Sequence, residues 1–203
     1  ARQLCPDMVI LPPRMELYAE FSRKVRRIYS DYTDICEGFG LDESWLDVTG
    51  CVRDGAAAAE EIRSRVKREL GVTVSIGVSW NKVFAKLGSD YKKPDAVTVI
   101  SRDTYKSLVW PLPASELLYV GRSTARCLSS MGITTIGGVA GSDPRMLRRR
   151  LGKAGELLYA FANGEDCSLV RPESAMPPVK SIGNGTTTPR DMSTSRDVWI
   201  TLA

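Results

Sequence analysis

The stretch Gly40-Leu-Asp-Glu-Ser-Trp-Leu-Asp-Val-Thr-Gly50 places two adjacent carboxylates between short apolar runs. Together with the residues around it, this pattern predicts two adjacent strands within residues 35–52, with Asp42 and Glu43 at their junction. Strand neighbours point to opposite faces, so both carboxylates serve one site only where the chain turns. Such a pair repels and is easiest to sustain around a divalent cation. The alternative is an ordinary acidic surface turn.

Helical and extended patterns alternate around this stretch. Apolar residues at three-to-four spacing predict helices, and β-branched runs between turn formers predict strands. The predicted elements are a helix at 14–29, a helix at 55–70, a strand at 72–78, a helix from Ser79 or Asn81 to Ser89, and a strand at 96–100. Their order predicts an α+β fold with helices covering one face of a sheet.

Two further clusters are candidates for binding phosphate. Lys82 and Lys86 share one face of the predicted helix, and Lys93 follows on a loop stiffened by proline. Lysines there can bind a triphosphate as point charges. The alternative, favoured for Lys82 taken singly, is a solvated basic helix face.

After Pro111 the pattern is wholly helical, with glycines between short helices. Residues 117–133 predict a short helix, a tight Val-Gly turn and a second helix from Ser123, a helix-hairpin-helix that offers backbone amides to phosphate. The alternative is ordinary helix packing at a glycine. Three prolines within 171–178 indicate a linker, and 179–191 begins another strand-like unit.

Composition limits the chemistry. The 203 residues are 43% apolar and 26% charged, as in ordinary globular proteins, and no apolar run approaches the roughly 20 residues of a membrane helix. Five scattered cysteines and no histidine exclude the common zinc sites and the usual protease constellations. The net charge of +4 suits a polyanionic partner, and a cytoplasmic location without membrane contact is the default expectation.

Taken together, these segments resemble the Y-family (DinB/UmuC, ImpB/MucB/SamB-type) translesion DNA polymerases. The acidic stretch is similar to the family's palm motif, and four more segments resemble its motifs in the same order: 75–86, 89–94, 151–164 and 180–191. The resemblance implies a partial palm domain at 1–103 with an antiparallel-rich sheet, a helical thumb at 104–172, a linker at 173–179, and the start of a little-finger domain at 180–203.

The resemblance also implies a function. Members of the family add deoxynucleotides to a primer opposite damaged template bases during DNA repair, using two Mg²⁺ ions. Asp42 and Glu43 would be catalytic metal ligands, with Glu43 nearer the primer hydroxyl, and Lys93 would contact the incoming deoxynucleoside triphosphate. Asp47 is expected to be structural. The implied partners are primer-template DNA, the triphosphates, and a sliding clamp bound through a region outside this chain.

The thumb hairpin of the family holds the DNA backbone. The matching positions here are Val120, Gly121, Ser123 and Thr124, and Arg122 adds a phosphate contact. Tyr119 departs from the pattern, because it stands where the first glycine of Gly-x-Gly usually lies. This weakens the expectation of close backbone approach at that position.

A second departure concerns the amino terminus. The family's first strand, with a further metal-binding aspartate and a steric gate, and its fingers domain are expected before residue 1, so this chain alone is expected to be inactive. Two other functions remain open: a non-catalytic helix-hairpin-helix DNA-binding protein, and a palm-type nucleotide cyclase, which leaves residues 111–191 unexplained.

Overall fold

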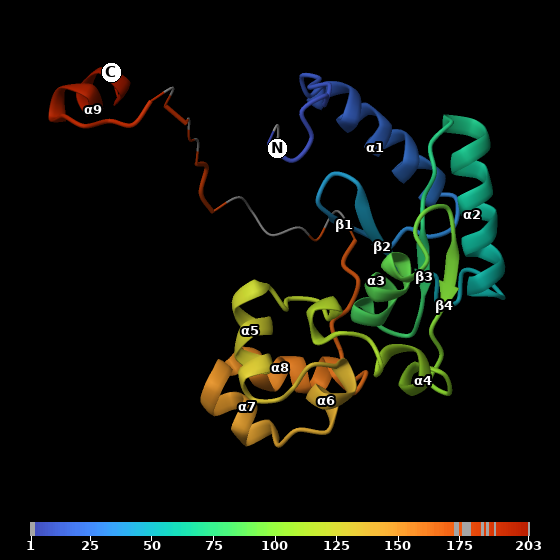
Figure 1. Cartoon of the computed structure of the whole chain (residues 1–203). Helices are drawn as coiled ribbons and strands as arrows, with labels where there is room; N and C mark the ends of the chain where they lie inside the picture. Colours follow the sequence, from blue (N-terminus) through green and yellow to red (C-terminus); the bar gives the residue numbers. More distant parts are fainter. Residues whose placement is uncertain are drawn as a thin grey trace.

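The computed structural model describes residues 3–172, 175, 180–183, 185, 187–188 and 190–202. Two units follow one another along the chain (Figure 1). The α/β unit runs from helix α1 to strand β4, and the helical unit runs from the short helix η1 to helix α8, with α4 between them. The expected mixture of helices and small sheets is present.

The first strand pair carries the acidic stretch. Strands β1 (Cys36–Phe39) and β2 (Glu43–Leu46) are antiparallel, and Phe39 lies opposite Glu43. The three residues between them form the turn, in which Gly40 has a φ of 81°, a left-handed conformation that glycine adopts without steric cost. The hairpin predicted from the sequence is confirmed.

The second strand pair is parallel. Strands β3 (Ile76–Val78) and β4 (Val97–Val99) are joined by helix α3 (Lys82–Tyr91), which packs directly on β3. A Cβ at Gly77 would lie 1.9 Å from the Ala85 carbonyl oxygen, so only glycine allows this close approach. The described strands are thus divided equally between antiparallel and parallel pairing.

Two longer helices complete the α/β unit. Helix α1 (Met15–Tyr29) packs on α2 (Gly55–Leu70) through Ile28, Ile62 and Val66, the buried members of a small apolar cluster. The Asp54 side chain caps the start of α2 and Gly71, in the left-handed region, ends it. The bounds of α2 are those predicted from its i, i+4 spacing.

The helical unit is built from short helices. They are η1 (Ala114–Glu116), α5 (Arg122–Ser130), α6 (Ile136–Ala140), α7 (Pro144–Leu151) and α8 (Lys153–Ala162), and the connecting helix α4 (Tyr105–Val109) precedes them. The first helix expected in the helix-hairpin-helix, from Leu117, is wrong: the chain is extended at Leu117, and only the three-residue 3-10 turn η1 precedes it.

One apolar core spans both units. Phe84 and Ile100 of the α/β unit belong to the same buried cluster as Leu128, Leu147 and Leu158 of the helical unit. Indole hydrogen bonds reinforce this joint: Trp80 Nε1 donates to the Gly164 carbonyl and Trp110 Nε1 to the Ala162 carbonyl, each at 3.1 Å.

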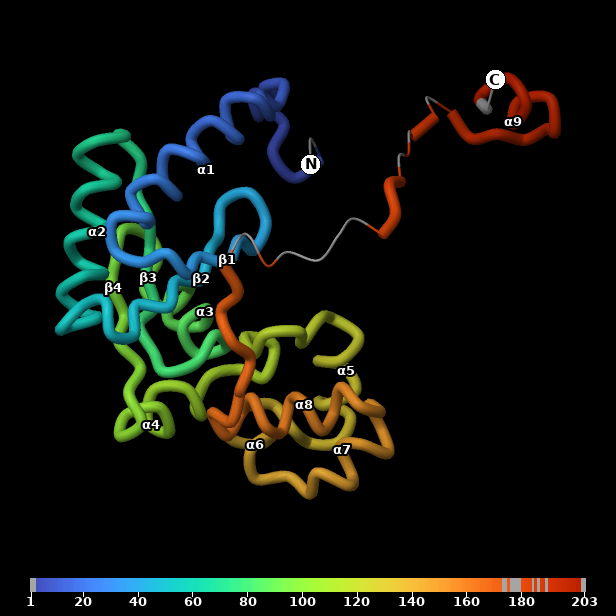
Figure 2. Tube along the Cα trace, turned by 180° about the vertical axis from the view of Figure 1, so that it is seen from behind, coloured from blue at the N-terminus to red at the C-terminus, as the bar shows by residue number. Residues whose placement is uncertain are grey.

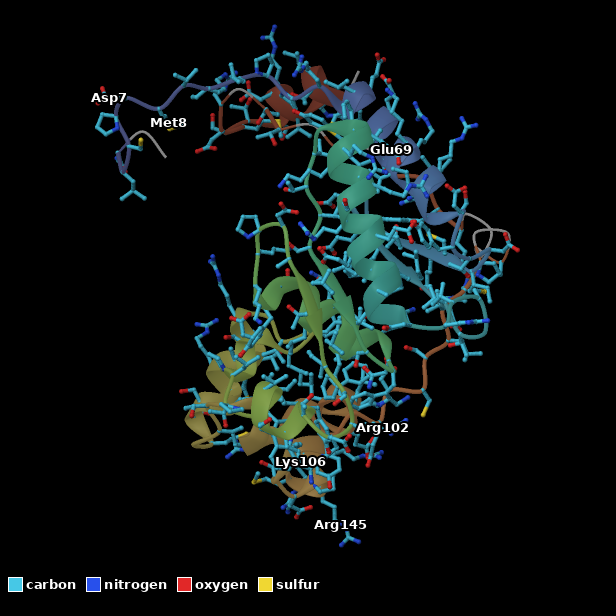
Figure 3. All side chains as sticks on the ribbon, turned by 90° about the vertical axis from the view of Figure 1, so that its right-hand side faces the viewer. Asp7, Met8, Glu69, Arg102, Lys106 and Arg145 are labelled. Atoms are coloured by element: carbon cyan, nitrogen blue, oxygen red, sulfur yellow. The ribbon has the colours of Figure 1, made fainter. Side chains whose placement is uncertain are left out.

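Two cations lie over these indoles at the joint. The Arg102 guanidinium lies 4.9 Å from the Trp80 ring centroid, and the Lys106 ammonium lies 4.9 Å from that of Trp110. Figure 3 shows Arg102 and Lys106 at the same end of the molecule, opposite Glu69 on α2. The two units therefore meet through a packed aromatic and cationic joint.

Two predictions about strands need correction. The strand predicted at 72–78 is wrong in length, because β3 is limited to the three residues that pair with β4. The described residues of 179–191 contain no strand, and a lone strand lacks the partners it needs for stability. Val179, Asn184, Thr186 and Pro189 lie outside the described residues, as does most of the linker at 173–179.

The carboxyl-terminal helix α9 (Ser195–Leu202) lies away from both units in Figures 1 and 2. Within the described part of the chain, no helix is long and apolar enough to cross a membrane. No disulfide joins the five cysteines, all of which are among the described residues.

Candidate active site

The two acidic residues lie at the end of the β1–β2 hairpin, and side chains of helix α1 hydrogen-bond to the turn. Arg26 Nη2 donates to the Gly40 carbonyl oxygen at 3.0 Å, and the Ser22 hydroxyl donates to the Leu41 carbonyl. Asp42 is exposed in the turn, and Glu43 begins β2. Both residues belong to the lining of one cavity.

A cavity of about 420 Å³ lies between the two strand pairs. Residues of β2 and β3 line it, and each of these strands is paired with only one neighbour, so their open edges face the same space. Its charged lining includes Asp42, Glu43 and Lys93. The structure thus brings the predicted metal ligands and the predicted triphosphate lysine to one cavity.

Four side chains of alternating charge form a row of ion pairs beside this cavity: Glu43, Lys86, Asp90 and Lys93. Lys86 Nζ lies 2.9 Å from Glu43 Oε1 and 2.6 Å from Asp90 Oδ2, and Lys93 Nζ lies 2.6 Å from Asp90 Oδ1. Burial lowers the pKa of Lys86, but the bonds from Asp90 and Glu43 outweigh it and raise that pKa overall. The pKa of Asp90 is lowered, because bonds from Lys86 and Lys93 outweigh its burial.

The loop that carries Lys93 is anchored to helix α2. Asp95 pairs through one oxygen with Arg63 and through the other with Lys67, each at 2.6 Å. These bonds, that of Lys67 first, lower the pKa of Asp95 and keep it ionised. Lys93 is therefore held near the cavity while its own side chain stays 53% exposed.

Lys82 does not lie on a solvated helix face, so that interpretation is wrong. Its side chain is only 11% exposed, pairs with Glu37 Oε2 at 2.8 Å and lies 4.4 Å above the Trp45 ring centroid. The Trp45 indole in turn donates to the Lys82 carbonyl oxygen. Because Glu37 lies on β1 and faces α3, the ammonium group of Lys82 is neutralised by an ion pair inside the protein. Lys82 is not among the residues that line the cavity.

Glu37 also holds the chain that leaves the helical unit. Its Oε2 accepts a hydrogen bond from the Arg171 backbone N–H at 2.7 Å. Figures 1 and 2 show this segment running from α8 alongside α3 toward β1. Although burial opposes it, the bonds from Lys82 and Arg171 lower the pKa of Glu37.

Asp47, expected to be structural, is used within the hairpin. Its Oδ1 accepts a hydrogen bond from the Thr49 backbone N–H at 2.9 Å. The Thr49 side chain first, and this backbone bond second, lower the pKa of the Asp47 carboxyl group. It is absent from the cavity lining.

The turn before α5 carries the predicted DNA-binding residues. Val120 is buried, Gly121 is the N-cap residue, and Arg122 to Thr124 form the first turn of α5, whose backbone N–H groups have no intrahelical partners. Gly121 has ordinary backbone angles and open space around its Cα, so the fold itself does not require glycine there.

Tyr119 has a φ of 69°, the left-handed conformation for which glycine is suited. Its ring centroid lies 6.1 Å from that of Phe161, a contact that helps to fix it. The position therefore has the backbone geometry expected of the first turn glycine, although a tyrosine occupies it.

Two carboxylates are hard oxygen donors of the kind that Mg²⁺ prefers. The Asp42 carboxylate makes no hydrogen bond or ion pair with any described residue, and the Glu43 carboxylate makes one ion pair, with Lys86. The pair fits part of a divalent-cation site. Across the described ranges, no group of three or more His, Cys, Asp or Glu residues is placed to complete it.

Several residues that build the site were not found from the sequence. The sequence motifs assign no site role to Ser22, Arg26, Asp90 or Asp95. Their roles depend on tertiary neighbours. The spacing of Lys86, Asp90 and Lys93 at three to four residues was the available signal.

Comparisons with known proteins show what the sequence and the fold of this chain are similar to. Residues 1–90 match the model of the impB/mucB/samB family. DinB of Sulfolobus solfataricus superposes with a TM-score of 0.75 at 27% identity, covering 84% of this chain and 52% of that structure. An insertion ternary complex of Dbh DNA polymerase superposes with a TM-score of 0.74 at 27% identity, covering 83% and 51%. The fold is thus that of a Y-family polymerase palm and thumb.

Residues 1–90 thus resemble the impB/mucB/samB family, and the whole chain is similar to part of DNA polymerase IV. DNA polymerase IV of Acetivibrio thermocellus is 52% identical over 205 residues, which cover all of this chain and 51% of the relative. DNA polymerase IV 1 of Bacillus subtilis is 38% identical over 200 residues, covering 98% of this chain and 48% of the relative. The chain therefore spans about half the length of the curated relatives it matches.

Proposed function

We propose that this chain supplies part of the active site and part of the DNA-binding surface of a DNA-directed DNA polymerase for translesion synthesis and repair. One observation carries the proposal: the adjacent residues Asp42 and Glu43 and the distant Lys93 line a single cavity. A carboxylate pair beside a lysine is the arrangement that nucleotidyl transfer needs, since cations and phosphates meet there.

Each residue has a distinct role in this proposal. Asp42 and Glu43 hold divalent cations, and Glu43 lies nearer the primer hydroxyl. When bound, two Mg²⁺ ions supply charge stabilisation for the attacking and leaving oxygens. Lys93 contacts the triphosphate, and the Asp95 anchor to α2 keeps its loop in place.

The cavity also offers a place for a further strand. The open edges of β2 and β3 face it, and the apolar side chains of Ala58, Ala59 and Ile62 form part of its lining. A strand added there would satisfy the backbone groups of both edges. The aspartate that the resemblance assigns to the amino-terminal palm strand would then lie beside Asp42 and Glu43.

The DNA-binding part of the proposal rests on the turn at residues 120–124. The open space at Gly121 lets a phosphate approach the backbone, and the free N–H groups of the first α5 turn point to an anion with the favourable end of the helix dipole. Arg122 is exposed and adds a salt-sensitive contact. Such contacts hold the DNA backbone and do not select a sequence.

Two titrations of the chain test this proposal against the purely DNA-binding alternative. Mn²⁺, followed by electron paramagnetic resonance and displaced by Mg²⁺, reports on the carboxylates, while fluorescence anisotropy of labelled primer-template reports on the turn. Changing Asp42→Asn together with Glu43→Gln is expected to abolish the Mn²⁺ site and to preserve DNA binding. Asp103→Asn, which removes an exposed carboxylate that makes no described contact, is the matched control.

If the double variant binds Mn²⁺ as the unchanged chain does, the catalytic assignment is wrong. DNA binding that persists in that case would favour the non-catalytic DNA-binding function. If Mn²⁺ binding persists in the carboxylate variant and DNA binding persists in variants of residues 120–124, neither function belongs to these residues.

A further inference from the structure

Lys86 lies where it competes with a cation for Glu43. Its ammonium group is 2.9 Å from Glu43 Oε1, and its side chain is only 19% exposed. At this distance the lysine neutralises the carboxylate, and a divalent cation on the same carboxylate would be repelled by the ammonium charge. The ammonium charge therefore opposes cation binding at Glu43 for as long as Lys86 stays paired with it.

Asp90 gives Lys86 a second partner. The Lys86 ammonium already lies 2.6 Å from Asp90 Oδ2, one helical turn further along α3. When Lys86 leaves Glu43 it keeps this bond, so a largely buried ammonium group is never left unpaired, which would be costly. Lys86 can thus leave Glu43 and remain paired with Asp90.

We infer that Lys86 is the counter-ion of Glu43 in the cation-free site, and that cation loading transfers Lys86 fully to Asp90. This inference rests on the proposed function, in which Glu43 is a metal ligand, and it assigns a positioning role to Lys86 and Asp90. Lys93 shares Asp90 through the other carboxylate oxygen. The transfer therefore weakens the hold on Lys93 and makes it available to a phosphate.

The test is the Mn²⁺ titration of the chain with two lysine variants. Lys86→Met nearly keeps the length of the side chain and removes its charge, so it is expected to tighten cation binding about threefold to tenfold, the size expected for losing a partly exposed ion pair. Lys92→Met removes the same charge near the same loop, and no described contact joins Lys92 to Glu43 or Asp90. It is expected to change the affinity less than twofold.

Asp90→Asn is a second variant, and it is expected to change the cation affinity in the opposite direction. Without the Asp90 charge, Lys86 has only Glu43 as an anionic partner, so cation binding is expected to weaken. A purely structural role for Lys86 would not give opposite changes in the Lys86 and Asp90 variants. Thermal unfolding followed by circular dichroism establishes that each variant is folded.

The outcomes separate this inference from the function on which it rests. Unchanged or weaker binding in Lys86→Met, with the site still abolished by Asp42→Asn and Glu43→Gln, overturns the inference alone. If Lys86→Met and Lys92→Met tighten Mn²⁺ binding equally, the inference is also overturned, because the change then reflects the net charge of the protein and not the contact with Glu43. Cation binding that survives loss of both carboxylates overturns the proposed metal site and the inference with it.

Discussion

The Trp80 indole donates a hydrogen bond to the Gly164 carbonyl oxygen at 3.1 Å, although 84 positions separate the two residues in the chain. Asn81, the N-cap of α3, donates to the same carbonyl oxygen at 3.1 Å. One backbone carbonyl at the end of the helical unit is thus held by two side chains at the start of α3. This relationship ties the helix that carries Lys86 to the unit that carries the proposed DNA-binding turn.

Gly164→Ala is expected to weaken this joint. Gly164 has a φ of 75°, and an added Cβ would lie 2.8 Å from Trp80 and 3.0 Å from Phe84. Backbone strain and overpacking together are expected to lower the free energy of unfolding by about 3 kcal/mol. Gly71→Ala is the control, since Gly71 has a similar φ of 69° and open space, and it is expected to cost only about 1 kcal/mol. Equal losses in urea unfolding would show that the contact with Trp80 carries no weight.

Glu37→Gln is expected to destabilise the chain by about 3 kcal/mol near neutral pH, because it leaves the nearly buried Lys82 without its charged partner. It should also change the response to acid. The pKa of Glu37 is lowered in the folded chain, so its contribution is present above the ordinary value of 4.5 and is lost as the pH falls through the folded value.

Melting temperatures between about pH 5 and pH 3 check this sign. The unchanged chain is expected to lose stability more steeply than the Glu37→Gln variant over that range. Glu116→Gln, at an exposed position, should follow the unchanged chain. Parallel curves for the Glu37 variant and the unchanged chain would contradict the ion pair.

Gly121→Ala is expected to weaken primer-template binding several-fold without changing the melting temperature. The fold leaves open space at this position and ordinary backbone angles, so a methyl group meets only an approaching ligand. Fluorescence anisotropy and circular dichroism measure the two quantities on the same sample. Unchanged DNA affinity would remove Gly121 from the binding surface.

Arg122→Ala is expected to reduce the salt dependence of DNA binding. One lost phosphate contact should lower the slope of the logarithm of the binding constant against the logarithm of salt concentration by about 0.9. The change should be the same for different DNA sequences, because phosphate contacts carry no sequence information. Arg53→Ala, an exposed arginine of the α/β unit, is the control for loss of charge, and an equal change there would contradict a local contact.

The sequence predicted the elements that depend on local patterns. Helix α2 has the predicted bounds because its apolar spacing, the Asp54 cap and Gly71 all act within the segment. The hairpin with Asp42 and Glu43 was predicted for the same reason, since glycine and the paired apolar runs define it locally.

What depends on distant neighbours could not be predicted. Lys82 looked like a solvated lysine because its partner Glu37 lies on another element, and only the pairing of β1 with β2 places Glu37 against α3. The bond between Lys86 and Glu43 likewise joins residues 43 positions apart. Helical spacing specifies a face, but it does not specify what that face meets.

The central claim is that Asp42 and Glu43 support nucleotidyl transfer, and a chimera tests it most directly. In DNA polymerase IV of Acetivibrio thermocellus, this chain would replace the half that it matches at 52% identity. Primer extension with Mg²⁺ on plain and abasic templates would then be compared with a chimera that carries Asp42→Asn and Glu43→Gln. We expect extension by the first and none by the second, with equal DNA binding by both. Extension that survives the double substitution, or a folded, DNA-binding chimera that extends no primer, would contradict the claim.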